Sequence, residues 1–307
     1  MEKVIVTGAT SMLGLALLKE CINNNIEVIA IIRENSTKSE LIPLSPYVKV
    51  VQCDLKNLSS CILPENGNYD AFYHFAWECT DNKSRNYVEA QDINIGYTLD
   101  AVKFAHKYGC KKFVGAGSQA EYGRVDGKIS TDMRVAPDSA YGVAKYAAGR
   151  MSAILSQQLG IEFIWTRIFS TYGINDMPST MIMYCIDSLL KQQKPILTRC
   201  EQVWDYLNCK DAGRAFYLIG EKGKDQAVYN IGSGSPHTLL EYVYEIRDAI
   251  DKNLEVGIGE KEYAHKQVMH LCADITNLMY DTGFAPAITF KEGIRETIEW
   301  YKEIVSK

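Results

Sequence analysis

The chain has 307 residues, of which 47% are hydrophobic, and a formal net charge of −5. A chain of this length can bury a full core and form one large unit with a smaller lobe. The small acidic surplus and the lack of any basic run argue against nucleic acid as a partner.

The first predicted element is a buried strand that runs into a tight turn and a helix. The strand covers 3–7 and the helix 13–23, with Gly8 and Gly14 on either side of the turn. A dinucleotide site places its phosphates at the N-terminus of such a helix and normally uses three glycines. Ser11 stands at the middle position, so two of the three are present. The position of this unit at the start of an α/β chain favours a dinucleotide site.

Strands and helices alternate through the first half of the chain. Further strands are predicted near 27–32, 48–52, 71–75, 112–115 and 162–167, and further helices near 87–108 and 140–159. This alternation is typical of a parallel doubly wound sheet. Beyond 171 the regularity changes, and 237–307 mixes helices with short strands. The predicted fold class is therefore α/β, a Rossmann sheet with a second, smaller α/β lobe.

The end of the second strand bears on the choice of cofactor. NAD-binding proteins of this fold carry an acidic residue there for the ribose hydroxyls, whereas this chain has Ile32 followed by Arg33. An arginine suits a 2′-phosphate, so NADP(H) is favoured over NAD(H). The alternative is that Arg33 is a solvated residue at the start of a loop.

Three Tyr-x-x-x-Lys pairs occur in the chain: Tyr108/Lys112, Tyr141/Lys145 and Tyr206/Lys210. Only Tyr141 and Lys145 fall inside a long predicted helix, where the two side chains lie one above the other. An ammonium beside a phenol stabilises the phenolate, so the pKa of Tyr141 is expected to fall below its usual value of about 10. Apolar residues recur on another face of the same helix, at Val143, Ala147, Met151, Ile154 and Leu155.

Ser118 follows the strand 112–115 in a Gly-rich turn. Ligands of parallel sheets bind at the carboxyl ends of the strands, where a hydroxyl can donate a hydrogen bond to a substrate oxygen. Serine is also common in turns. The combination with Tyr141 and Lys145 favours a catalytic Ser118.

The segments TGATSMLG, FYHFAW, YGVAK and TRIFSTYG, together with Asp54, Asn94 and Ser118, occur in the order and spacing of one family. The chain resembles the extended short-chain dehydrogenase/reductases, specifically the NAD(P)-dependent nucleotide-sugar epimerases, dehydratases and reductases. The resemblance extends through VYNIGSGSPHTLLEYV to the C-terminal segment that ends in IEWYK.

The resemblance implies a role for each matching residue. Ser118 would polarise the sugar carbonyl, Tyr141 would be the general acid/base, and Lys145 would hold the nicotinamide ribose. The implied cofactor contacts, besides Tyr141, Lys145 and Arg33, are Gly8, Ser11, Met12, Leu13 and Gly14 at the pyrophosphate, Asp54 and Leu55 at the adenine, and Phe75 and Ala76 beside the cofactor.

The resemblance also implies a domain division and an assembly. Residues 1–171 and about 205–235 would bind the dinucleotide, and about 172–204 with 236–307 would form the substrate lobe. A homodimer is expected, because many relatives dimerise through the helices near 87–108 and 140–159.

Departures from the family pattern narrow the reaction. Dehydratases carry an Asp-Glu pair after the catalytic Ser/Thr, where this chain has Gln119 and Ala120. Ala120 and Asn175 replace the Cys and His of reductases that epimerise carbons 3 and 5. We therefore predict an NADP-dependent reductase of a nucleoside-diphosphate 4-keto-6-deoxy sugar. The alternatives are an NAD-dependent nucleotide-sugar 4-epimerase and a non-catalytic NAD(P)-binding sensor.

Two further departures concern the substrate. Ser170 replaces an Asn that often contacts the nucleotide sugar, and Trp204 replaces an Arg that commonly meets the diphosphate. Either the substrate is not a nucleoside diphosphate, or that Arg is replaced by Arg199, Lys194, Lys261 or Lys266. Trp204 can stack on a base or sugar, or serve only in packing. The predicted substrate contacts are Gln119, Ser170, Arg199 and Trp204.

The nine cysteines form no C-x-x-C pair, and free thiols in a reducing cytoplasm are expected. His265, His270 and Cys272 share no common face, so no metal site is expected. The first strand begins directly after Glu2, which leaves no room for a signal peptide, and no apolar stretch approaches the roughly 20 residues of a membrane span. We expect a soluble, cytoplasmic protein.

Overall fold

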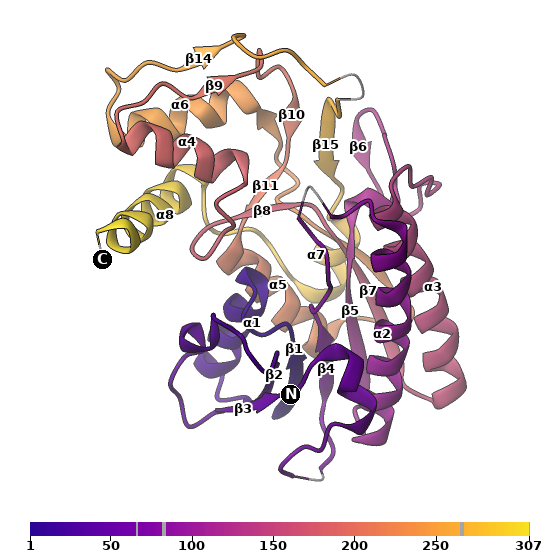
Figure 1. Ribbon diagram of the computed structural model, residues 1–307. Coiled ribbons are helices and arrows are strands. Elements are labelled where there is room, and N and C mark those ends of the chain that lie inside the picture. The colour runs from indigo at the N-terminus through magenta and orange to yellow at the C-terminus, as the bar shows by residue number, and fades with distance from the viewer. Residues whose placement is uncertain (66, 82–83, 265–266, 307) are drawn as a thin grey trace.

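A computed structural model describes residues 1–65, 67–81, 84–264 and 267–306 (Figure 1). Its main feature is a seven-stranded sheet in the order β12-β7-β5-β4-β1-β2-β3, in which every neighbouring pair is parallel. The strands are β1 (Lys3–Thr7), β2 (Glu27–Ile32), β3 (Val48–Gln52), β4 (Ala71–His74), β5 (Lys112–Ser118), β7 (Glu162–Ile168) and β12 (Val228–Ile231). The predicted doubly wound parallel sheet is confirmed.

Helices cover both faces of this sheet. Figure 1 shows α2 (Val88–Lys107) beside α3 (Ala140–Leu159) on one face, and α1 (Met12–Asn23) with α5 (Cys209–Lys222) on the other. Successive side chains of a strand point to opposite faces, and β1 accordingly supplies Val4 and Val6 to the core under α1 and α5 and Ile5 to the core under α2 and α3. Each buried aliphatic side chain of this kind stabilises the fold by about 1.5–3 kcal/mol.

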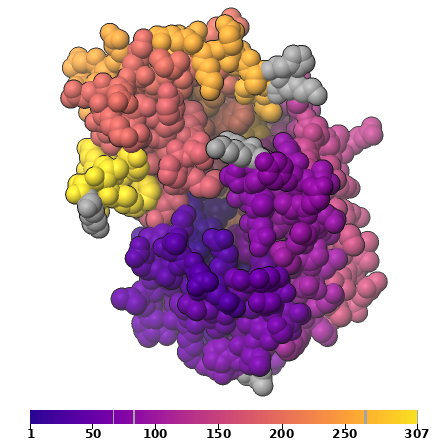
Figure 2. Space-filling view, in the orientation of Figure 1, coloured from indigo at the N-terminus to yellow at the C-terminus, as the bar shows by residue number. Residues whose placement is uncertain are grey.

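A smaller lobe lies beyond the carboxyl ends of the central strands. Its helices α4 (Met181–Leu190), α6 (Leu239–Ile250) and α8 (Phe290–Val305) enclose a third core. A mixed four-stranded sheet has the order β13-β10-β15-β6, formed by His237–Thr238, Val203–Trp204, His270–Ala273 and Lys128–Ile129. Figure 2 shows that the surface is hollowed where this lobe meets the large domain. The exact domain boundaries stay a prediction.

Short elements complete the architecture. The pairs β8 (Ser170–Tyr172) with β11 (Tyr206–Asn208) and β9 (Ile196–Leu197) with β14 (Gly257–Ile258) are parallel, and α7 (Thr276–Thr282) packs against α5. The 3-10 helices are η1 (Ser39–Leu41), η2 (Leu55–Ser60) and η3 (Gln119–Glu121). Among the described residues, no helix is long and apolar enough to cross a bilayer, and all nine cysteines are free thiols.

Two local details differ from the sequence-based picture. The strand predicted over 112–115 continues to Ser118, because β5 stays paired with β7 up to Ser118 and Ile168. On α3, the apolar face points outward, with Met151 47% exposed and Ile154 55% exposed. The buried face of α3 consists of smaller residues and Lys145, since this helix packs closely on α2 and the sheet: Gly142, Ala144, Lys145, Ala148, Gly149, Ser152 and Ser156.

Candidate active site

The turn between β1 and α1 is built by close backbone packing. Gly8 has φ +68°, and a Cβ there would come within 2.6 Å of the Ala76 backbone nitrogen. A Cβ on Gly14 would lie 2.4 Å from the Gly8 carbonyl oxygen. Ser11 is the N-cap of α1, and its Oγ accepts a hydrogen bond of 3.0 Å from the Gly14 N–H. Ser11 therefore satisfies one helix-terminal donor itself, and the other N–H groups at this terminus remain suited to a phosphate.

A groove of about 640 Å³ runs from this turn along the carboxyl ends of β1, β2 and β3. It brings together six of the predicted cofactor residues: Gly8, Arg33, Asp54, Leu55, Phe75 and Ala76. Ser11 and Leu13 line the adjoining pocket that holds Tyr141. The shape, the helix terminus and the carboxylate of Asp54 fit a dinucleotide.

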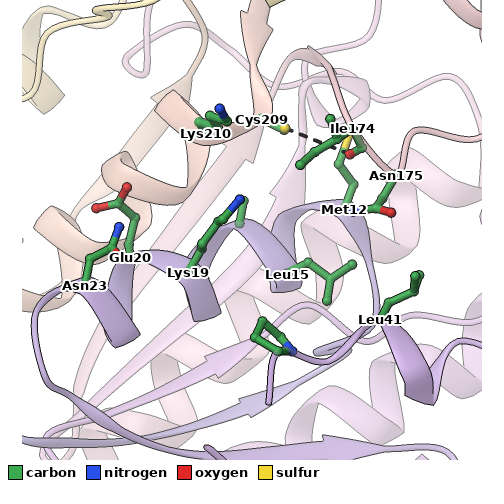
Figure 3. Close-up of a pocket in the computed structure, with 12 residues that line it drawn as sticks. Met12, Leu15, Lys19, Glu20, Asn23, Leu41, Ile174, Asn175, Cys209 and Lys210 are labelled. Atoms are coloured by element: carbon green, nitrogen blue, oxygen red, sulfur yellow. Dashed lines mark hydrogen bonds between the residues drawn. The ribbon is translucent and has the colours of Figure 1, made fainter. Parts of the chain in front are cut away.

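Met12 is placed differently from its neighbours. Its side chain lines a separate pocket of about 270 Å³ on the other side of α1, beside Leu15, Leu41 and Asn175 (Figure 3). Because the first residues of α1 turn about the helix axis, consecutive side chains cannot all face one groove. Only the backbone of Met12 is left to contact a cofactor.

The predicted catalytic residues lie in one pocket of about 400 Å³ that adjoins the groove. Ser118 is the last residue of β5, and Tyr141 and Lys145 lie one turn apart at the start of α3. Gln119 and Ser170 line the same pocket. The sequence-predicted trio is therefore assembled where the parallel strands end.

Lys145 is buried, with only 4% of its surface exposed. Its Nζ donates a hydrogen bond of 2.6 Å to the Ala116 carbonyl oxygen and lies 3.6 Å from the centre of the Trp77 ring. Burial lowers the pKa of Lys145 to about 7. Its ammonium is 5.7 Å from the centre of the Tyr141 ring, so Trp77 is its nearer aromatic partner.

The expectation that the pKa of Tyr141 falls below its usual value is wrong for this structure. Burial raises it, and this effect outweighs the lowering by the Arg85 charge and by the Ser118 hydrogen bond. Helical spacing alone suggested a close ammonium. In the structure the Lys145 ammonium is directed to the Trp77 ring and the Ala116 oxygen instead.

Two residues of this pocket were missed in the sequence. Trp77 follows Ala76, and its ring meets that of Tyr141 edge-on, with centres 6.1 Å apart. The guanidinium carbon of Arg85 lies 4.5 Å from the centre of the Tyr141 ring. Both belong to the segment after β4, and loops that follow neighbouring parallel strands meet at the same edge of the sheet. That rule could have identified them.

A third missed residue, Glu121, lies behind Ser118 and is fully buried. Its Oε1 accepts hydrogen bonds of 2.9 Å from the Ser118 backbone N–H and from Trp165 Nε1, and its Oε2 accepts one of 2.8 Å from Arg167 Nε. Ser118 Oγ accepts from the Ala120 N–H at 3.1 Å, which completes a capping box at η3. This network fixes the backbone that carries the Ser118 hydroxyl.

The predicted substrate residues divide into two groups. Gln119 and Ser170 line the pocket that holds Ser118 and Tyr141, and Trp204 Nε1 donates a hydrogen bond of 2.8 Å to Ser170 Oγ. Arg199 does not line this pocket; its side chain is 68% exposed and lies 3.5 Å from Glu201. Lys194 pairs with Glu260.

The residues of the other two Tyr-x-x-x-Lys pairs do not line this pocket. Lys112 Nζ donates to two backbone carbonyls, the Tyr108 hydroxyl donates to the Cys61 carbonyl, and Lys210 pairs with Glu296, so both lysines are engaged away from the tyrosine of their pair. His265 and Lys266 lie outside the described residues. Within the described ranges, no group of three His, Cys, Asp or Glu side chains could hold a metal ion.

A family model described as "NAD dependent epimerase/dehydratase family" matches residues 4–232. The chain belongs to this family. Membership agrees with the dinucleotide groove beside the Ser118, Tyr141 and Lys145 pocket. It makes the chain an NAD(P)-dependent enzyme of the extended short-chain dehydrogenase/reductase type, a group that acts on nucleotide sugars.

Curated relatives of this epimerase/dehydratase family member differ in their reactions. A dTDP-glucose 4,6-dehydratase of Streptomyces niveus is 23% identical, covering 98% of this chain and 93% of its own length. A dTDP-4-dehydro-6-deoxyglucose reductase of Escherichia coli is also 23% identical, covering 96% of each chain.

Two solved structures share the fold over nearly the whole chain. One is a UDP-N-acetylglucosamine 4-epimerase from Methanobrevibacter ruminantium M1 in complex with UDP-N-acetylmuramic acid, with a TM-score of 0.88, 22% identity and 99% of each chain covered. The other is a UDP-glucuronic acid 4-epimerase from Bacillus cereus in complex with NAD, with a TM-score of 0.84, 20% identity, and 98% and 99% covered.

Proposed function

We propose that this protein is an NAD-dependent nucleotide-sugar 4-epimerase. The observation that carries the proposal is a pocket with a single acid/base, Tyr141, beside Ser118 and a dinucleotide groove, in a chain that matches two 4-epimerases over almost its full length. Gln119 and Ala120 cannot supply the second acid/base that a dehydration needs. This proposal takes precedence over the reductase that the sequence favoured.

The pocket residues have complementary tasks in such a reaction. Tyr141 takes the proton of the sugar 4-hydroxyl and later returns it to the same oxygen. The Ser118 hydroxyl donates to that oxygen and keeps it beside Tyr141. Lys145, which is buried and lines the same pocket, would hold the nicotinamide ribose. Bound NAD supplies reversible hydride exchange at the sugar carbon.

NAD is the proposed cofactor because one structurally similar 4-epimerase was solved with NAD. The α1 terminus would hold the pyrophosphate, and Asp54 would face the adenosine portion. Arg33 lies in the same groove and is exposed. Its guanidinium suits a 2′-phosphate and keeps NADP as the second candidate.

A reductase is the second candidate function. The groove position of Arg33 and the similarity to a dTDP-4-dehydro-6-deoxyglucose reductase favour it. A reductase of this kind would use the same Ser118 and Tyr141, with the proton moving from Tyr141 to the keto oxygen. A non-catalytic sensor is disfavoured because such a protein has no need of a Tyr, Ser and Lys cluster in one pocket.

The test begins with the nucleotide that purifies with the protein. We expect retained NAD, released on denaturation and identified by chromatography, and interconversion of a UDP- or dTDP-sugar with its 4-epimer without added cofactor, followed by NMR. Tyr141→Phe should lose at least about 100-fold in turnover, whereas the control Tyr146→Phe, on the same helix but lining another cavity, should not.

The two candidate functions give different results in this test. NADPH consumption with a nucleoside-diphosphate 4-keto-6-deoxyhexose, and no 4-epimer from any sugar, would replace the epimerase by the reductase. Full turnover by Tyr141→Phe would contradict both.

A homodimer is part of the proposal. The outward face of α3, defined by the exposed Val143, Met151 and Ile154, lies next to α2, on which Val88 and Ile93 are exposed as well. Apolar patches of this kind typically mark protein interfaces. A second copy of the chain that presents the same two helices would cover it as a symmetric contact.

A further inference from the structure

Arg85 is positioned to act on the catalytic tyrosine. It lies in the segment between β4 and α2, and it lines the pocket together with Ser118 and Tyr141. Its guanidinium carbon is 4.5 Å from the centre of the Tyr141 ring, within the range of a cation–π contact. A stacked guanidinium keeps its in-plane N–H donors directed to the sides.

Arg85 is closer to Tyr141 than the helical lysine is. The Lys145 ammonium is 5.7 Å from the same ring centre and contacts Trp77 and the Ala116 carbonyl instead. Burial also brings the pKa of Lys145 to about 7, so its charge is partly lost at neutral pH. A guanidinium stays protonated at any pH at which the protein is folded.

We propose that Arg85 acts through Tyr141 as a positioning residue that stabilises the phenolate by packing a permanent positive charge against the tyrosine ring. The inference rests on the proposed function, in which Tyr141 exchanges a proton with the sugar hydroxyl. In this proposal Arg85, a loop residue, supplies much of the positive charge that stabilises the phenolate, a role that the sequence spacing had assigned to Lys145.

The charges that face Tyr141 come from four elements. Arg85, from the segment before α2, and the Ser118 hydroxyl, from β5, lower its pKa, while Glu121, from η3, raises it. Lys145, one turn along α3, lies farther off. Burial and the Glu121 charge both raise the pKa of Tyr141. Loss of Arg85 would remove one of the two effects that lower this pKa, so the pKa should rise further.

A spectroscopic titration tests the proposal without any substrate. The near-ultraviolet absorbance of tyrosinate is recorded against pH for the wild type and for Tyr141→Phe, and the difference isolates Tyr141. The same difference is measured in the Arg85→Gln background. We expect the Tyr141 midpoint to rise by about one pH unit in Arg85→Gln and to stay near the wild-type value in Arg85→Lys.

Arg150→Gln is the matched control, because Arg150 is exposed on α3 and lines a different cavity. It should leave the midpoint unchanged. An equal midpoint in wild type and Arg85→Gln, or an equal shift in Arg150→Gln, would overturn the proposal.

Kinetics give a second readout once a sugar is turned over. The phenolate is the base, so the rising limb of the plot of kcat/KM against pH should move to higher pH by about one pH unit in Arg85→Gln. At neutral pH this shift lowers kcat/KM about tenfold, and the loss should disappear at high pH. A uniform loss at every pH would assign Arg85 to structure or binding and overturn the proposal. If no sugar is turned over, the proposed function fails while the titration still decides the role of Arg85.

Discussion

The buried pair of Glu121 and Arg167 offers a stability prediction of defined size. Glu121 has no exposed surface and the Arg167 side chain is 7% exposed. Removing one member of such a pair leaves an uncompensated buried charge, which costs about 3–5 kcal/mol. In Glu121→Leu, the N–H donors of Ser118 and Trp165 also lose their acceptor. We expect this variant to lose at least about 3 kcal/mol of unfolding free energy.

The double variant isolates the charge pair. Glu121→Leu with Arg167→Met removes both charges and keeps similar volumes, so it should cost clearly less than the sum of the two single variants. Urea unfolding followed by circular dichroism at neutral pH measures all three. Asp138→Asn is the control, because Asp138 and Arg124 form an exposed pair at 2.9 Å that is worth under about 1 kcal/mol.

Two outcomes would refute this reasoning. A loss below about 1 kcal/mol in Glu121→Leu would mean that the pair carries little net interaction. A double variant equal to the sum of the singles would mean that the two groups act independently. The first result would also remove the argument that Glu121 fixes the backbone of Ser118.

Three further predictions concern other parts of the molecule. Gly14→Ala should weaken NAD binding at least about tenfold in calorimetry, because its Cβ would come 2.4 Å from a backbone oxygen, whereas the exposed helical control Gly96→Ala, which meets nothing within 4 Å, should bind normally. The buried His74 has its pKa lowered to about 3 by burial, so the stability that its neutral form contributes is lost as the pH falls from about 6.5 towards 3. Between about pH 6.5 and 4.5 the unfolding free energy should drop by about 2 kcal/mol more in the wild type than in His74→Gln, and an equal drop would contradict this. Met151→Asp with Ile154→Asp should give a monomer in analytical ultracentrifugation, and an unchanged dimer mass would exclude this face as the interface.

Six of the seven strands of the large sheet were predictable from local signals, and β12 (Val228–Ile231) was not among the predicted strands. A central parallel strand is buried on both faces, so it reads as a short apolar run between polar turns. The strands at 3–7, 27–32 and 48–52 have the predicted bounds, and the helix at 140–159 has its predicted ends. The smaller lobe was harder, since its strands are mostly two residues long, as at Val203–Trp204, and are held by pairing partners far away in the chain.

The candidate site was predictable where the chemistry follows from spacing along one element. Tyr141 and Lys145 are four residues apart on one helix, and Ser118 ends the strand that α3 covers, so the structure brings all three into one pocket. The direction of the Tyr141 pKa shift did not follow from spacing, because it depends on burial and on Arg85, which is 56 positions earlier in the chain. The spacing of residues along one helix does not show how deeply Tyr141 is buried, nor that Arg85 lies beside it.

Trp77 and Arg85, which line this pocket, come from the segment after β4. In a doubly wound sheet the carboxyl ends of neighbouring strands lie side by side, so the segment after β4 must lie beside Ser118 at the end of β5. Trp77 and Arg85 contact the side chains of Lys145 and Tyr141 for this reason. An aromatic ring that engages the lysine leaves its ammonium less available to the phenol, and an arginine from the same segment restores a positive charge there. Trp77 and Arg85 therefore have opposite electrostatic effects on Tyr141. Exchanging Trp77 for a small residue should let Lys145 approach Tyr141 and reduce the effect of Arg85→Gln on the tyrosine titration. An undiminished effect in the double variant would show that the two residues act separately.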